Sequence, residues 1–445
     1  MTEYVTIEKD VYENLLKTAQ KIVELQKRVE ELEKRLWIYE NPNVSSSKRM
    51  MKEDKEEHKP EGKRGAPEGH IGATRKRPTP NRFIDLKPEQ CAKCESKDIA
   101  ITGKERRLIE DIKIEKVVTE FTQYDYHCNN CREDHVTTHP ELPREGIFGP
   151  TITGIWETLH YVGTIPFDRL SKISGNLFEM KITAAGIHNA IYRTAEIFEP
   201  TFEEIRNEII NSEYVRSDET SYPFNGENWW LWNLSNHNVS LVLLRNSRGQ
   251  DVLREILGCQ FCGILNSDCL PVYDNFGVGV CQKCWAHILR FAKSAAEEDA
   301  YGKKINEMLK EMFGYIKEVK AKRLEGTPEV MDRIEGMKSE IRSLRKNKRR
   351  SRITERLRKR LQKHANSWFT CLEYDFVEPT NNLSEQDIHK SINSRKISGQ
   401  HRSIVGTHCR EIMMSTILTK QKNDVNVFDF IQRGIMQHNV SSVGS

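Results

Sequence analysis

The sequence predicts a multidomain α/β protein in which a mixed sheet carries a helical insertion and is preceded by a coiled coil, a zinc ribbon and a helical linker region. Three observations favour this fold class. Apolar residues recur every seven positions near the N-terminus, paired cysteines follow them, and short apolar runs in the second half alternate with helical patterns. The chain has 445 residues, which is room for about three domains.

The composition is that of a globular chain with highly charged segments, because 37% of the residues are hydrophobic and 30% are charged. The net charge of +4 is small, so only the distribution of charge can indicate a partner. A run of roughly 18 apolar residues is absent, and the first residues lack a signal-peptide pattern, so we expect a cytoplasmic protein without membrane contact. Eight of the eleven cysteines form four Cys-x-x-Cys pairs, which indicates metal ligands or reduced thiols.

Residues 1–41 are predicted to form a leucine-zipper-like coiled-coil helix. One column of the heptad pattern holds Leu15, Ile22, Val29 and Leu36, and the other holds Val11, Leu25, Leu32 and Tyr39, with Thr18 as the one gap. Aliphatic residues in both columns, with charged residues between them, favour a two-stranded coiled coil and hence a homodimer or higher oligomer. The alternative is a single amphipathic helix packed on the rest of the protein.

Residues 42–84 are predicted to be a basic, flexible linker. They contain almost no large apolar residue, so they cannot bury enough surface to fold alone. Between positions 48 and 82, eleven Lys or Arg residues stand against six acidic ones. This charge suits contact with phosphates, and a merely solvated linker is equally compatible with it.

A zinc ribbon is predicted over residues 85–145. Cys91-x-x-Cys94 and Cys128-x-x-Cys131 are two pairs whose four thiolates can bind one tetrahedral zinc ion. The thirty-three residues between the pairs exceed the usual spacing. Alternating apolar residues from Ile109 to Phe121 nevertheless fit a pair of strands that would separate the two pairs.

The rest of the chain alternates between helical and strand patterns. Apolar runs at 214–215, 229–234 and 239–244 predict three strands, and a helix and two further strands follow up to residue 281. We expect a mixed sheet that is antiparallel at first and then joined by crossovers. The predicted divisions are a helical region at 146–211, a first part of the sheet domain at 212–284, a basic helical insertion at 285–370, a last part of the sheet domain at 371–420, and a tail at 421–445.

Two aspartates stand where the first and fourth of these strands are predicted to end. They are Asp218 and Asp268, and if the two strands are neighbours, both carboxylates lie at one edge of the sheet. Carboxylates are ligands for Mg²⁺, and a pair of such ions can activate a hydroxyl and stabilise the leaving oxygen of a phosphodiester.

Glu385 is the best candidate for a third carboxylate, because it opens a helix predicted to run to about Ser394. Asn382, three residues earlier, also fits a capping box, in which the glutamate only bonds a free backbone N–H. The spacing alone leaves both interpretations open.

Several motifs follow one another in an order shared with a known family. They are Ser217-Asp218-Glu219-Thr220, Ser267-Asp268, Cys284-Trp285-Ala286-His287, Thr380-Asn381-Asn382 with Glu385, and Arg395-Lys396-Ile397-Ser398-Gly399. With these motifs the chain resembles the transposases of the insertion sequence 66 family. The leucine-zipper-like helix, the Ser-rich junction after it and the four-cysteine segment are also similar to that family.

The resemblance implies a DDE-type transposase with a ribonuclease H-like catalytic domain, in which Asp218, Asp268 and Glu385 form the triad and hold Mg²⁺ or Mn²⁺. The 117 residues from Asp268 to Glu385 would contain a helical insertion in that domain. The implied reaction is cleavage at transposon ends by water, followed by attack of the freed 3′-hydroxyl on target DNA. The implied partners are the terminal repeats and target DNA, and the protein would be nucleoid-associated.

A second cysteine group, Cys259-x-x-Cys262 with Cys281-x-x-Cys284, also has zinc-like spacing. If the strands beside it are parallel neighbours, Cys262 and Cys284 are separated by about 16 Å of strand, which one ion cannot bridge. The resemblance instead implies that Cys284 and His287 support the active site.

Phosphate contacts are expected in two places. Residues 342–363 hold twelve Lys or Arg residues, including Arg349 and Arg350, against one acid, and they predict a helix that is basic on every side. Arg395 and Lys396 follow Glu385 and could hold a phosphate near the metal ions. Recognition of specific sequences would fall to the zinc ribbon and the linker. The alternative function is a catalytically inactive DNA-binding protein derived from a transposase, and the three retained carboxylates favour the enzyme.

Overall fold

The computed structural model describes residues 77–258, 261–276, 279–346, 351–398 and 402–441, together with seven residues between Thr18 and Val29. The chain divides into two units, one from Glu53 to Val118 and one made of Met1–Lys52 and Thr119–Ser445.

Most of the predicted coiled coil lies outside the described residues. The seven described residues there are helical, and three of the predicted heptad positions, Ile22, Leu25 and Val29, are about half exposed. Residues 42–76 of the predicted linker also lie outside the described part of the chain.

The strand pair predicted between Ile109 and Phe121 is wrong. Residues 77–118 of the first unit contain neither a helix nor a strand, and Ile109, Ile112 and Val117 are at least 75% exposed. An alternating apolar pattern becomes a strand only where a second strand pairs with it and a core covers one face. In the described part of this segment neither is provided. A small antiparallel pair forms further on, from β1 (Asp125–His127) and β2 (Asp134–Val136), on the two sides of the second cysteine pair.

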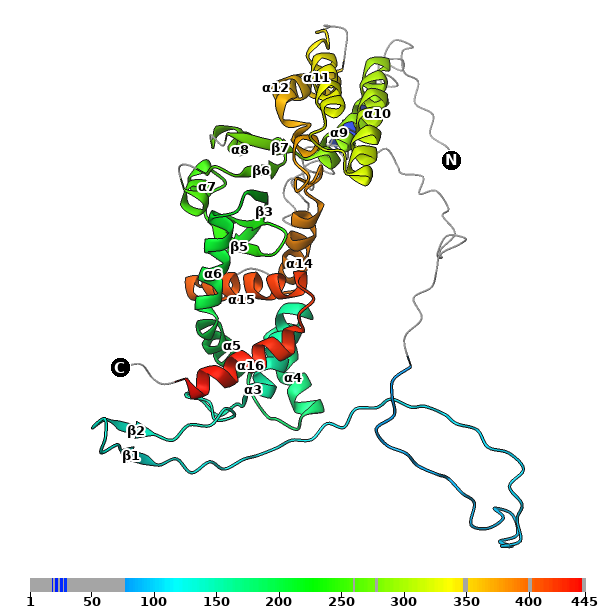
Figure 1. The fold of residues 1–445 in the computed structure, drawn as a ribbon, viewed down its shortest axis with the longest axis vertical. Helices are drawn as coiled ribbons and strands as arrows, with labels where there is room; N and C mark the ends of the chain where they lie inside the picture. Colours follow the sequence, from blue (N-terminus) through cyan, green and yellow to red (C-terminus); the bar gives the residue numbers. More distant parts are fainter. Residues whose placement is uncertain are drawn as a thin grey trace, which may run out of the picture. The chain divides into compact units, whose positions relative to one another are not determined.

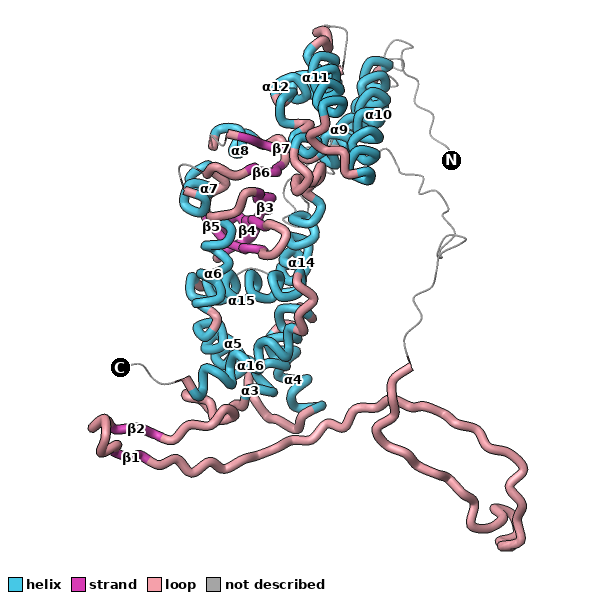
Figure 2. The backbone as a smooth tube through the Cα atoms, in the orientation of Figure 1, coloured by secondary structure: helices cyan, strands magenta, loops and turns pink. Residues whose placement is uncertain are grey.

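The predicted mixed sheet is confirmed. Its strands are β3 (Tyr214–Phe224), β4 (Glu227–Ser235), β5 (Ser240–Arg245), β6 (Ile264–Ser267) and β7 (Val280–Lys283), in the order β5-β4-β3-β6-β7. The first three strands are antiparallel, whereas β6 and β7 run parallel to β3. Figure 2 shows the strands grouped together with helices around them.

Local sequence explains the connections of the sheet. Asn225 and Gly226 join β3 to β4 with φ values of 44° and 83°, and two positive φ values are the condition for the tight turn that matches strand twist. The parallel strands need longer crossovers, which are provided by α7 (Gln250–Leu257) and α8 (Pro271–Asn275).

Helices from both ends of the second unit share one core with the sheet. The N-terminal ones are α3 (Pro150–Glu157), a π-helical turn (Thr158–Val162), α4 (Phe167–Leu177), α5 (Ala184–Ile197) and α6 (Glu199–Ile210), and the C-terminal ones are α14 (Asn382–Ser398), α15 (Ile404–Lys422) and α16 (Val427–Val440). Helix α14 packs on β3 and β4 (Figure 1). Helix α16 lies in the segment expected to be a tail, and it packs on α3 with Ile431 and Ile435 buried.

The insertion is helical, as predicted, and has a core of its own. It contains α9 (Trp285–Glu298), α10 (Ala300–Lys322), α11 (Pro328–Arg342) and α12 (Arg352–Lys363), followed by a 3₁₀ turn (Ala365–Ser367) and α13 (Thr370–Glu373). The single helix predicted over 342–363, basic on every side, is wrong. Helix α11 ends at Arg342, and α12 buries Leu357 and Leu361 on one face, because an isolated highly charged helix gains little without packing.

Side chains of helix α15 accept hydrogen bonds from the free backbone N–H groups of the edge strand β5. The backbone N–H groups of Ser240, Val242 and Leu244 donate to Thr419 Oγ1, Ser415 Oγ and Glu411 Oε1, at 3.0, 2.9 and 2.7 Å. Every second residue of a strand is about 6.6 Å further along it, and every fourth residue of a helix is about 6 Å further along the helix axis. The spacing of the acceptors on α15 therefore matches the spacing of the N–H groups on β5. The edge strand is therefore closed to further strand pairing.

These bonds predict a difference between two buried threonines of α15. Thr419→Val removes the acceptor for the Ser240 N–H and is expected to lower the free energy of unfolding by about 1 to 3 kcal/mol. Thr416→Val is the control, because its buried hydroxyl has no hydrogen-bond partner, and it should be neutral or slightly stabilising. Urea unfolding measures both, and equal losses would contradict the proposed role of the helix.

Candidate active site

Asp218 lies within β3 and not at its end, which corrects the predicted position. The strand continues to Phe224, but its parallel pairing with β6 stops at Arg216, opposite Asn266. Asp218 thus stands just beyond the end of β6. The side chain is half-buried, and its Oδ1 accepts the N–H of Glu219 at 3.0 Å.

Asp268 follows β6 directly, as predicted. Its Oδ1 accepts the N–H of Leu270 at 2.8 Å, which fixes the carboxylate against the turn after the strand. The neighbouring strands β3 and β6 are parallel, so the two aspartates lie toward the same edge of the sheet, as the sequence predicts.

Glu385 sits in the first turn of α14, after a segment that is bonded to both strands. Asn266 on β6 donates from its Nδ2 to the carbonyl of Glu378 at 2.8 Å, and buried Asn381 donates from its Nδ2 to the carbonyl of Ser217 at 2.8 Å. The Oε1 atom of Glu385 has no hydrogen bond, which speaks against a capping role for this oxygen. The structure therefore brings Glu385 to the edge of the sheet that carries the aspartates.

The electrostatics of Asp218 show that the acidic groups lie close together. Burial raises the pKa of Asp218 well above its ordinary value, and the negative charges of Glu219, Asp268 and Glu385 raise it further. Carboxylates that lie close together away from water repel one another, and this repulsion is relieved when they bind protons or cations. The donor set, made only of carboxylate oxygens, suits Mg²⁺ or Mn²⁺.

Glu219 is a buried acid to which no role was assigned from its sequence pattern. Its carboxylate accepts two hydrogen bonds from Arg248, at 2.9 and 2.7 Å, and one from the Tyr273 hydroxyl. Arg248 also stacks 4.4 Å from the ring centre of Trp230. Burial, followed by the charge of Asp268, raises the pKa of Glu219 to about 7, although Arg248 and Tyr273 oppose the shift.

Lys283 is a buried cation beneath Asp268 that the sequence analysis also missed. Its Nζ donates to the carbonyl of Asp268 at 3.1 Å and forms an ion pair with Asp274 at 3.0 Å, while its side chain is 2% exposed. The sequence feature that could have indicated it is a lysine at the end of a predicted strand, directly before Cys284, because a lysine in such a place is seldom buried without a partner.

Cys284 and His287, for which the family resemblance implied a supporting role, lie beside Glu385. Cys284 is buried and its Sγ accepts the N–H of Asn381 at 3.2 Å. His287 Nδ1 stands 3.5 Å from Glu385 Oε1, and Arg290 Nη2 stands 3.8 Å from the same oxygen. Of the other two cysteines in that group, Cys262 is exposed and Cys259 lies outside the described residues.

The two N-terminal cysteine pairs share one local geometry. The N–H of Cys91 donates to Ser96 O and that of Cys128 to Glu133 O, at 2.8 and 2.9 Å, and the residue after each pair, Glu95 or Arg132, has a positive φ near 60°. Backbone N–H groups of Lys93 and Cys94 lower the pKa of Cys91, and those of Cys131 and Asn130 lower the pKa of Cys128. Each pair is thus a turn suited to thiolates. The first pair belongs to the unit from Glu53 to Val118 and the second pair to the other unit.

The second pair also has other potential ligands nearby. Cys131 Sγ lies 3.7 Å from His135 Nε2, and with Glu133 these side chains place three ligand atoms within 4.8 Å of one another, all on exposed residues.

The predicted phosphate-binding residues are only partly described. Arg349 and Arg350 lie outside the described residues, and so do the side chains of Arg395 and Lys396, whose backbone belongs to α14. The exposed face of α12 carries four basic residues at helical spacing, namely Arg352, Arg356, Lys359 and Lys363.

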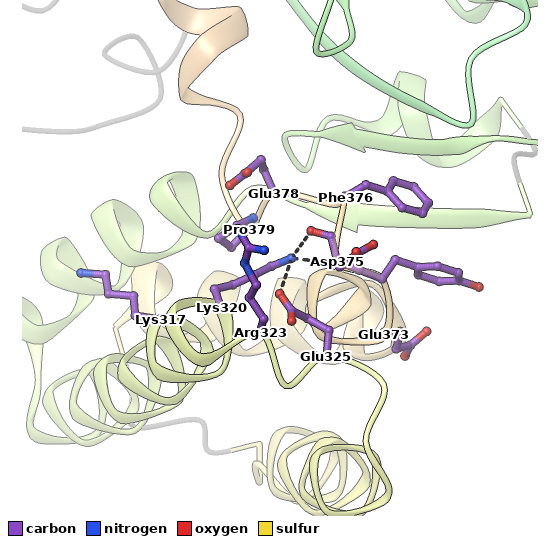
Figure 3. A pocket seen from close by; sticks show the side chains of 10 residues that line it. Lys317, Lys320, Arg323, Glu325, Glu373, Asp375, Phe376, Glu378 and Pro379 are labelled. Atoms are coloured by element: carbon purple, nitrogen blue, oxygen red, sulfur yellow. Dashed lines mark hydrogen bonds and ion pairs between the residues drawn. The ribbon is translucent and has the colours of Figure 1, made fainter.

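A pocket of about 830 Å³ opens at the C-terminal end of α10, and neither Asp218, Asp268 nor Glu385 lines it. Figure 3 shows Lys320 pointing toward Glu325 and toward the chain at Asp375. Lys320 Nζ lies 3.1 Å from Glu325 Oε1 and donates to the carbonyls of Tyr374 and Asp375 at 3.2 and 2.8 Å. This contact ties the insertion to the segment that leads to Glu385.

The fold is a mixed α/β domain that gathers acidic residues from distant segments at one place. The sequence model described as Transposase IS66 family matches residues 145–408, which is more than half of the chain. The chain therefore belongs to the IS66 family of transposases, and membership shows a DNA transposase in general terms. A search of curated proteins found no match. Among the helices that the structure describes, none has the length and apolar character needed to cross a membrane.

The raised pKa of Glu219 predicts a pH-dependent stability. Glu219 ionises near 4.5 in the unfolded chain but near 7 in the folded protein, so without divalent metal the free energy of unfolding should fall as pH rises through this window. The contribution of Glu219 is up to about 3 kcal/mol. Glu219→Gln should flatten the curve measured by urea unfolding in EDTA, whereas Glu227→Gln, on the exposed end of β4, should leave it unchanged. Identical curves for wild type and Glu219→Gln would contradict the assignment.

Proposed function

We infer that the chain is a DDE-type transposase whose catalytic domain is ribonuclease H-like, with Asp218, Asp268 and Glu385 as the triad. The observation that carries this inference is that the three carboxylates lie close together although they are far apart in the sequence. The negative charges of Asp268 and Glu385 contribute to the raised pKa of Asp218. The strand order of the sheet, with β3 central and β6 parallel to it, supports the ribonuclease H-like assignment.

The three carboxylates would hold Mg²⁺ or Mn²⁺, and such ions activate the attacking oxygen and stabilise the leaving oxygen of a phosphodiester. The residues of the chain provide the placement. Lys283 holds the backbone of Asp268, while Arg248 and Tyr273 hold Glu219 behind Asp218. Cleavage by water at the transposon ends and attack of the 3′-hydroxyl on target DNA are the same displacement, so one site can serve both steps.

The four cysteines Cys91, Cys94, Cys128 and Cys131 would bind a structural zinc ion. The matching turns, and the backbone N–H groups that favour thiolate at Cys91 and Cys128, support this proposal. The ribbon and the preceding linker would recognise the terminal repeats, and the heptad helix at 1–41 would form a homodimer or higher oligomer.

The exposed stripe of α12 would contact DNA phosphates. Arg352, Arg356, Lys359 and Lys363 follow one another at intervals of four, three and four residues, so they lie along one helix face opposite Leu357 and Leu361. Lys363 is 2.7 Å from Asp274, and this pair links the stripe to the crossover after Asp268.

Asp268→Asn should abolish strand transfer, with a loss of at least about a thousandfold, and leave binding of the transposon ends nearly intact. The assay incubates purified protein with a labelled duplex of the element's ends and Mg²⁺ or Mn²⁺. Glu378→Gln is the control, because this exposed acid precedes the triad glutamate without belonging to the triad. Tight binding by the wild type without any products would favour the catalytically inactive DNA-binding alternative.

Cys91→Ser should reduce the zinc content by one ion per chain and weaken or misdirect binding of the ends, because three thiolates remain for the ribbon. Elemental analysis after gel filtration measures the zinc. Cys262→Ser, at an exposed cysteine outside the ribbon, should change neither quantity. An unchanged zinc content in Cys91→Ser would refute the ribbon.

Arg356→Ala combined with Lys359→Ala should weaken binding to any DNA sequence. The slope of the logarithm of the binding constant against that of the salt concentration should decrease by about 2, because two phosphate contacts are lost. The matched control is Lys303→Ala with Lys304→Ala, two exposed lysines of α10. Equal slopes for both double variants would exclude the α12 stripe as the contact surface.

A further inference from the structure

Cys284, His287 and Glu385 form a group of potential ligands that a carboxylate-only metal site does not use. Cys284 precedes α9 and His287 follows three residues later, so both side chains belong to the first turn of that helix. Glu385 comes from the first turn of α14. One ligand atom from each residue lies within 4.8 Å of the others.

Two atoms of this group are buried without a hydrogen bond. They are His287 Nδ1 and Glu385 Oε1, which face each other at 3.5 Å. Buried polar atoms normally have a hydrogen-bond partner, so two neighbouring atoms without one need an explanation. A direct hydrogen bond would bring the two atoms to about 2.7 to 3.2 Å.

The separation fits a shared metal ion. Zinc binds His nitrogen and carboxylate oxygen at about 2.1 Å, and with a tetrahedral angle the two ligand atoms then stand about 3.4 Å apart. The observed 3.5 Å agrees with this geometry. Arg290 Nη2 is 3.8 Å from the same oxygen, but its side chain is 41% exposed and can turn toward solvent when a cation occupies the site.

The chemistry of the three ligands selects a soft ion. Thiolate and imidazole favour zinc and similar transition metals, whereas Mg²⁺ prefers oxygen atoms only. The N–H of Asn381 donates to the Cys284 sulfur at 3.2 Å, which holds the sulfur in place. Burial raises the pKa of this thiol to about 11, so binding of the ion would release its proton.

We propose that Cys284 Sγ, His287 Nδ1 and Glu385 Oε1 bind one zinc-class ion, distinct from the zinc of the ribbon and from the Mg²⁺ of the triad, with the fourth position open. The role of this ion, although not its binding, rests on the proposed function. A carboxylate has two oxygens, so the ion can hold Glu385 by one of them and leave the other for the triad metal. Glu385 would thereby be fixed at the site by a bond stronger than any hydrogen bond it makes.

The test is the zinc content of the full-length protein and its variants after gel filtration. We expect two zinc ions per chain in the wild type, one in Cys284→Ser and one in Cys91→Ser. Cys281→Ser is the matched control, because this half-buried cysteine lies outside the group, and it should retain both ions. His287→Gln, at a partly exposed side chain, is a second variant in case Cys284→Ser does not fold, and it too should lose one ion.

The outcomes separate this site from the other proposals. Asp268→Asn should lose strand transfer and keep both zinc ions, so failure of the catalytic proposal leaves this one standing. If the ribbon binds no zinc, the wild type holds one ion and Cys284→Ser holds none. In protein with Cys91→Ser and Cys94→Ser, Co²⁺ should give the absorption of a single sulfur ligand, and Cys284→Ser should remove it. Folded Cys284→Ser and His287→Gln proteins with unchanged zinc content would overturn the proposal.

Discussion

Two asparagine side chains hold together three segments that are distant in the sequence, and the candidate site depends on them. Asn266 on β6 donates to the carbonyl of Glu378, and Asn381 donates to the carbonyl of Ser217 on β3. Both asparagines are completely buried, so breaking either bond would leave polar groups without water to replace it. Asp218, Asp268 and Glu385 stand one, two and four residues after Ser217, Asn266 and Asn381, so these contacts set the position of all three acids.

The acidic centre is destabilising by itself, and the fold offsets this with two cations, Arg248, which is partly buried, and Lys283, which is fully buried. Arg248 neutralises Glu219 and is fixed by stacking on Trp230, while Lys283 lies under the turn that carries Asp268. These cations bond to Glu219, to Asp274 or to backbone, and the mutual repulsion of Asp218, Asp268 and Glu385 remains. A divalent ion then has more to gain from binding here than at an ordinary acidic surface.

The helical insertion can be long because it brings its own core. Trp285, Trp368 and Phe369 are buried within it, and from the sheet only Tyr214 and Ile264 join the fully buried residues of this core. The insertion leaves the sheet after β7 and returns through a segment that Lys320 anchors to α10. The exposed face of α12 carries basic residues, whereas its opposite face packs in the core. The surface that suits DNA contact is therefore different from the residues whose packing positions Glu385.

The sequence by itself determined the elements whose signals are local. Apolar runs predicted where the strands lie, and Asp268 was placed correctly because it directly follows a strand. Periodicity failed for the alternating residues 109–121 and for 342–363, because pairing and packing by other segments decide whether such patterns become strands or continuous helices. Only the tertiary structure revealed Glu219 and Lys283 around the aspartates and the approach of Cys284 and His287 to Glu385. Those contacts join residues from separate parts of the chain, and no local pattern records which distant segments will share a buried site.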